Sequence, residues 1–102
     1  MTVLSQTYKI GSNRGRPRIW LEGNRLTASG IGRGDRFITH NVDEGVTIQI
    51  TPDGRRKVSG KGDRPIIDIV GADVTRWGFD IGDEVVITYT YNWIFIRRKE
   101  NA

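Results

Sequence analysis

Residues 21–38 read LEGNRLTASGIGRGDRFI, and residues 69–86 read IVGADVTRWGFDIGDEVV. The second stretch repeats the first at an offset of 48 residues, with a Gly-Asp dipeptide and several single residues at the same places. The match extends without a gap over residues 9–48 and 57–96, in which ten positions are identical. The chain therefore carries one small module twice, and an internal repeat constrains the fold before any single residue does.

The length of 102 residues corresponds to one domain. Half of this length is too little to bury a stable core, so we expect two repeats, about residues 3–50 and 52–98, to share one core in a single domain of residues 1–102. The chain has no cysteine, which excludes disulfides and thiolate metal sites. No apolar run reaches the length of a membrane helix, and residues 1–6 lack a signal-peptide pattern. We expect a cytoplasmic protein that does not bind membranes.

Alternating apolar residues and turn residues predict four strands and one short helix in each half. In the first half the strands are expected over residues 3–10, 17–21, 35–42 and 46–51, and the helix over 24–29. In the second half the strands are expected over residues 55–59, 65–70, 83–89 and 93–98, and the helix over 72–77. Residues 12–15 and 60–64 read as polar loops. The predicted fold is thus mainly β, with two tandem ββαββ repeats.

Apolar side chains that match across the repeat predict a shared core. The expected core residues are Ile19, Leu26, Phe37, Ile48, Ile67, Val74, Val85 and Ile96. Gly34 and Gly82 precede strands at sharp turns, where glycine tolerates positive φ, and the aspartates that follow them are expected to accept backbone hydrogen bonds.

The repeated pattern helix-Gly-Φ-x-x-Gly-Asp-x-Φ occurs at residues 30–37 and again at residues 78–85. With the residues around it, this pattern resembles the SymE-like branch of the SpoVT/AbrB/MazE superfamily. The resemblance implies a pseudo-twofold swapped-hairpin (AbrB-like) β-barrel, in which two modules interdigitate, usually as a homodimer. Both modules lie in one chain here. The resemblance also implies nucleic-acid binding by the surface around the first two strands of each module.

The net charge is +4 and the isoelectric point about 9.9, which favours a polyanionic partner. Segments 9–18 and 55–64 hold nine of the sixteen Lys and Arg residues. Arg16 and Arg64 match across the repeat, and the resemblance places both where AbrB-type proteins contact DNA; Asn13 is a candidate base reader. The helices differ from that family because each has one arginine only, Arg25 or Arg76. The expected nucleic-acid-binding residues are Lys9, Asn13, Arg14, Arg16, Arg18, Arg55, Arg56, Lys57, Lys61 and Arg64.

The sequence shows no set of residues typical of catalysis. His40 is the only histidine and is expected at the surface, and the glycines near residue 13 lack the Lys-Ser/Thr of a phosphate-binding loop. Trp20, Trp77 and Trp93 are expected in the core or in an interface. We therefore expect no enzymatic activity, no cofactor and no metal.

These observations favour a nucleic-acid-binding protein, namely a transcriptional or nucleoid-associated regulator of a prokaryote or its virus that docks a basic face on duplex DNA. Two alternatives stay open. One is a SymE-like toxin that binds RNA or another nucleic acid. The other is a protein-binding module, either antitoxin-like or a viral inhibitor of a host enzyme. The expected partner is DNA or RNA, and the expected assembly is a monomeric pseudo-dimer or a homodimer of pseudo-dimers.

Overall fold

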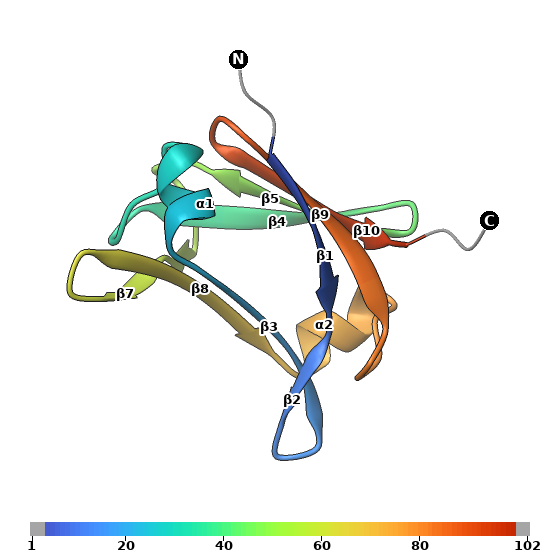
Figure 1. Ribbon diagram of the computed structural model, residues 1–102. Helices are drawn as coiled ribbons and strands as arrows, with labels where there is room; N and C mark the ends of the chain where they lie inside the picture. The colour runs from blue at the N-terminus through green and yellow to red at the C-terminus, as the bar shows by residue number, and fades with distance from the viewer. Residues whose placement is uncertain (1–3, 100–102) are drawn as a thin grey trace.

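We describe residues 4–99 in a computed structural model, in which these residues form ten strands and two short helices (Figure 1). The first half contains β1 (Leu4–Lys9), β2 (Gly11–Asn13), β3 (Arg16–Glu22), α1 (Asn24–Ala28), β4 (Arg36–Val42) and β5 (Gly45–Ile50). The second half contains β6 (Arg56–Lys57), β7 (Ser59–Lys61), β8 (Arg64–Val70), α2 (Ala72–Arg76), β9 (Glu84–Thr90) and β10 (Trp93–Arg98). The fold is therefore mainly β, as the sequence predicts.

The strands form two antiparallel sheets with the core between them (Figure 1). One sheet has six strands in the order β1-β9-β10-β5-β4-β6, and the other has four in the order β2-β3-β8-β7. In the middle of each sheet, a strand of the first half pairs with a strand of the second, β5 with β10 and β3 with β8. Neither half therefore contains a complete sheet by itself.

The strand register is unchanged when the two halves are exchanged. Ile19 pairs with Ile69 and Leu21 with Ile67, and adding 48 to 19 and 21 gives 67 and 69. Trp20 lies opposite Asp68, which is its own equivalent in the second half. Thr47 lies opposite Phe95 in the same way in the six-stranded sheet. The repeat in the sequence is thus also present in the hydrogen-bonding pattern.

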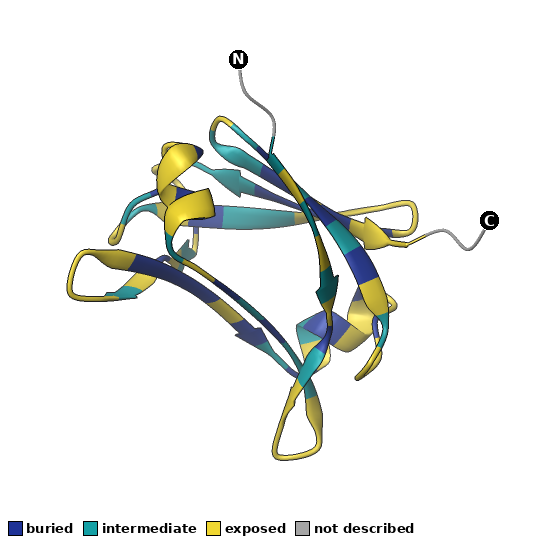
Figure 2. Cartoon of the chain, viewed as in Figure 1, coloured by how far each residue is buried: buried dark blue, intermediate teal, exposed yellow. Residues whose placement is uncertain are grey.

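The predicted core is confirmed. All eight side chains expected in it are at most 3% exposed. Figure 2 shows the buried positions alternating with exposed ones along the strands, as expected for sheets that have one face on a core. Burial of these aliphatic and aromatic groups is the main force that holds the two halves together.

The two antiparallel sheets do not close into one barrel, in contrast to the predicted β-barrel. Between β1 and β2, the Ile10 N–H donates to the Asp83 carbonyl at 2.9 Å and the Ile10 carbonyl accepts from the Gly82 N–H at 2.8 Å. Val58, between β6 and β7, makes the equivalent bonds to Asp35 and Gly34. The chain passes from one sheet to the other at these buried residues, so the strand ladders are interrupted there.

The glycines at the predicted sharp turns have the expected conformation. Gly34 has a φ of 93° and Gly82 a φ of 88°, which favours glycine. The Asp35 carboxylate accepts the Gly32 N–H at 2.8 Å, and the Asp83 carboxylate accepts the Asp80 N–H at 2.9 Å. The predicted structural role of both Gly-Asp pairs is confirmed.

Short strands account for most of the differences from the predicted elements. Residues 11–13 and 59–61 were expected to lie largely in loops and instead form β2 and β7. The strand predicted over residues 55–59 is divided at Val58, where the chain changes sheet. Both helices end one residue earlier than predicted. Residue 3, at the start of the first predicted strand, lies outside the described residues.

Candidate nucleic-acid interface

The two basic segments form hairpins at opposite ends of the four-stranded sheet (Figure 1). Arg14 and Gly15 form the tip of the β2–β3 hairpin, and both have positive φ, as a type I′ turn requires. Gly62, with a φ of 61°, lies at the tip of the β7–β8 hairpin. The tips point in opposite directions because β3 and β8 are antiparallel.

The outer face of the four-stranded sheet carries five of the predicted binding residues. Ile19 and Leu21 of β3 face the core, so the alternate side chains of this strand face outward. The same alternation in β8 and the strand register place the partners of β2 and β7 on that face. The five predicted residues on this outer face are Asn13, Arg16, Arg18, Lys61 and Arg64.

Two acidic residues on the same face neutralise part of this charge. The Arg18 guanidinium forms two parallel hydrogen bonds of 2.9 Å with the Asp68 carboxylate. Arg18 also lies over the Trp20 ring, 4.5 Å from its centroid. The hydrogen bonds to Asp68 raise the pKa of Arg18. Arg64 forms a looser, exposed ion pair with Glu22, in which Arg64 Nη1 lies 3.8 Å from Glu22 Oε2. Arg18 is thus held in one geometry by two neighbours.

Arg16 and Arg64 have different surroundings although they are equivalent in the repeat. The Arg16 guanidinium packs on Gly71, in the space that a β carbon at this glycine would occupy. Gly23, the equivalent of Gly71, has no such neighbour within 4 Å of a β carbon. Within residues 4–99, Arg16 forms no ion pair and its side chain is exposed.

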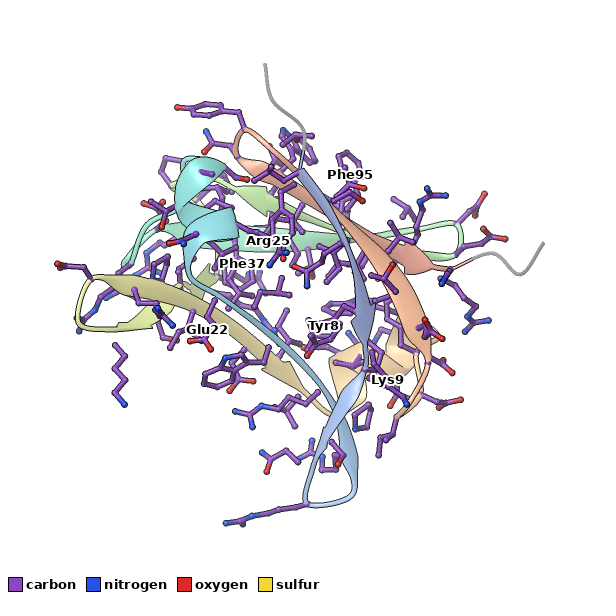
Figure 3. All side chains as sticks on the ribbon, in the orientation of Figure 1. Tyr8, Lys9, Glu22, Arg25, Phe37 and Phe95 are labelled. Atoms are coloured by element: carbon purple, nitrogen blue, oxygen red, sulfur yellow. The ribbon has the colours of Figure 1, made fainter. Side chains whose placement is uncertain are left out.

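Four predicted residues lie near the points where the chain changes sheet, namely Lys9 at the end of β1, exposed Arg55 directly before β6, and Arg56 and Lys57 of β6. Arg56 forms an ion pair with Asp73 of α2, and Asp73 also accepts from Arg76 at 3.0 Å. Lys9 and Lys57 are exposed at the ends of the edge strands β1 and β6, and Figure 3 labels Lys9 at its place on β1. The structure thus distributes the predicted residues over two hairpins and two sheet edges.

One basic residue near this surface was not among the binding residues predicted from the sequence. Arg33 lies across the β7–β8 hairpin, where its Nη1 donates to the Gly62 carbonyl at 2.9 Å. Its side chain also packs against Gly60, where a β carbon would collide with it. The repeat gave no signal for Arg33 because its equivalent, Ile81, is apolar.

Except for Trp20, which lies under Arg18, the other residues considered from the sequence lie apart from this surface. His40 is exposed, as predicted, with Nε2 3.2 Å from the Gln49 side-chain oxygen. Trp77 is 7% exposed and belongs to the core, whereas Trp20 and Trp93 are half-buried on the outer sheet faces. Among residues 4–99, no three His, Cys, Asp or Glu side chains are placed to hold a metal ion. Neither described helix is long and apolar enough to span a membrane.

Comparison with known proteins adds no assignment. No protein-family model, curated protein or solved structure matches this chain. The resemblance to the SpoVT/AbrB/MazE superfamily therefore rests on the repeated Gly-Asp pattern and stays a prediction.

Proposed function

We propose that this protein binds duplex DNA through the outer face of its four-stranded sheet, as a transcriptional or nucleoid-associated regulator. The observation that carries the proposal is the pair of equivalent hairpins at the two ends of that face, with Arg16 directly beside the tip of one and Arg64 directly beside the tip of the other. Arginine and lysine side chains bind phosphate oxygens, and arginine also forms paired hydrogen bonds with guanine.

The spacing of the two hairpins suits a duplex. Arg64 lies six residues along β8 from Val70, which pairs with Arg18, and Arg18 is two residues from Arg16, so eight residue positions separate the two arginines along the sheet. At about 3.3 Å per residue, the two arginines are roughly 26 Å apart along the strand direction, which is close to eight base pairs. A protein with two equivalent halves matches the local twofold symmetry of DNA, as dimeric DNA-binding proteins do.

We further propose that the chain is a pseudo-dimer of the AbrB-like, swapped-hairpin kind, complete within one molecule. The strand register supports this proposal because it is unchanged when the two halves are exchanged. The hydrogen bonds of Ile10 to residues 82 and 83, and of Val58 to residues 34 and 35, also support it because each joins a strand of one half to the Gly-Asp turn of the other.

Titration of fluorescent duplex DNA at several salt concentrations tests the DNA-binding proposal. The logarithm of the affinity is expected to fall with the logarithm of salt concentration, with a slope of about −0.9 for each phosphate contacted. Replacing both Arg16 and Arg64 with alanine is expected to flatten the slope by roughly 2 units.

The matched control is the double variant Arg98→Ala, Lys99→Ala, which removes two exposed positive charges at the end of β10 in the other sheet. This control is expected to change the slope little. Equal losses from both double variants would indicate unspecific charge attraction. No binding of duplex DNA at low salt would overturn the proposal, and tighter binding of double-stranded RNA would redirect it to RNA.

A further inference from the structure

Three aromatic rings form a row on the outer face of the six-stranded sheet. His40 of β4 stacks with Trp93 of β10, with ring centroids 6.5 Å apart and an interplanar angle of 27°. Trp93 stacks in turn with Phe95, with centroids 6.2 Å apart and an angle of 14°. Figure 3 shows Phe95 on the side of the sheet that faces away from the core.

The pattern of β10 is unusual because both of its faces are apolar. Ile94 and Ile96 point into the core and are at most 1% exposed. Trp93 and Phe95 alternate with them and therefore point outward, where Phe95 is 40% exposed. A strand whose function is to cover a core needs only one apolar face, so the outward rings need another explanation.

The neighbours of the row are mainly hydrogen-bonding side chains. Thr47 separates His40 from Phe95 in the register, and Gln49 lies beside Trp93. On the other side of β10, Thr88 and Thr90 pair with Phe95 and Trp93. The aliphatic exceptions on this face are Ile38 beside Gln49, Val86 beside Arg97, and exposed Val42 at the end of β4. Flat rings among hydroxyl and amide groups suit the faces and edges of nucleobases better than an aliphatic protein surface.

A positive charge continues the row. Arg97 lies two residues beyond Phe95 on the same face of β10 and is exposed. Among residues 4–99 it has no acidic side chain within ion-pair distance. A guanidinium beside stacked rings is the combination by which sheet surfaces bind single strands, since the rings stack on bases and the charge attracts phosphates.

We propose that this row, formed by His40, Trp93, Phe95 and Arg97, binds unpaired bases of single-stranded nucleic acid. The two sheets enclose one core, so this face and the proposed duplex surface lie on opposite sides of the molecule. The inference is independent of the duplex proposal, because it uses other residues and another sheet.

Titration of fluorescent oligothymidylate and oligouridylate with the full chain tests this proposal. Phe95→Leu and Trp93→Leu keep an apolar side chain but remove a ring, so each is expected to weaken binding roughly 5-fold to 100-fold. Phe95→Tyr keeps the ring and is expected to bind like the original chain. Circular dichroism and thermal melting identify any variant that does not fold.

Binding of duplex DNA separates the two surfaces. The leucine variants are expected to leave duplex affinity unchanged, and Arg16→Ala with Arg64→Ala is expected to leave oligothymidylate affinity within about 2-fold. If neither oligonucleotide binds at low salt, the inference is overturned. Equal binding by Phe95→Leu and Phe95→Tyr would also overturn it, since stacking would then be irrelevant. A dimer in sedimentation that Phe95→Leu dissociates would instead assign the face to a second copy of the chain.

Discussion

At the scale of single residues, Tyr89 shows how burial changes the pKa of a side chain. Its ring lies in the core, and its hydroxyl donates to the Gln6 side-chain oxygen at 2.7 Å. Burial raises the pKa of Tyr89 to about 12, because the phenolate would lose hydration in the core. Since the folded state favours the protonated phenol, its contribution to stability is complete below about pH 10, the pKa of an unfolded tyrosine, and is lost as the pH rises toward 12.

We therefore expect ultraviolet titration to show one tyrosine that ionises later than the rest. Tyr89→Phe is expected to abolish the late phase and to reduce the loss of stability between about pH 10 and pH 12. A late phase that persists in Tyr89→Phe would assign the shift to another tyrosine.

Gly71 and Gly23 offer a matched test of where Arg16 lies. Both begin a helix, with φ of 84° and 85°, so alanine at either position is expected to cost about 1–3 kcal/mol of backbone strain. A β carbon at Gly71 would also displace the Arg16 guanidinium, whereas one at Gly23 meets nothing within 4 Å. Gly71→Ala is therefore expected to weaken duplex binding more than Gly23→Ala does, at similar stability in urea. Equal duplex affinities of the two alanine variants would show that Arg16 does not take part in DNA binding.

At the scale of elements, the β3–β8 ladder predicts equal costs at equivalent positions. Ile19 and Ile67 are both at most 1% exposed and have equivalent partners across the ladder. Truncation of either to alanine is expected to reduce the free energy of unfolding by roughly 2–5 kcal/mol. Urea denaturation measures both values. A large loss from one variant with almost none from the other would show that the halves pack differently despite their common register.

The sequence predicted long elements well and short ones poorly. Alternation over six or seven residues identified strands such as β9 and β10, but β2 and β7 have three residues each, too few for a period to be read. Segments 9–18 and 55–64 could be identified from charge alone. The pairing of Arg18 with Asp68 could not, because it depends on the register between strands 50 residues apart.

At the scale of the whole molecule, the central ladders make the two halves interdependent. Residues 1–51 alone would lack β8 and β10, which pair with β3 and β5, and would lack the core side chains of the second half. We expect this fragment to be unfolded, or to self-associate and so replace the missing half. Circular dichroism and sedimentation distinguish these outcomes from a folded monomer, which would contradict the shared-core prediction.

The repeat predicted that the halves pack together but not how the sheets join. A β-barrel was expected, and the chain instead changes sheet at Ile10 and Val58, whose backbone groups bond to the Gly-Asp turns. Both residues looked in the sequence like ordinary apolar strand positions. The outward orientation of the aromatic rings of β10 could not be predicted either, because alternation alone does not tell which face of a strand is covered when both faces are apolar.

The residues that face their own equivalents have an evolutionary consequence. In a homodimer of identical modules, the position that Trp20 and Asp68 share would bring two tryptophans or two aspartates together. In a single chain the two members are free to diverge, and here one supplies a ring and the other a carboxylate around the same arginine. The two halves of this nearly symmetric scaffold therefore differ at its centre, and under the DNA-binding proposal its two ends would distinguish the two halves of a bound site.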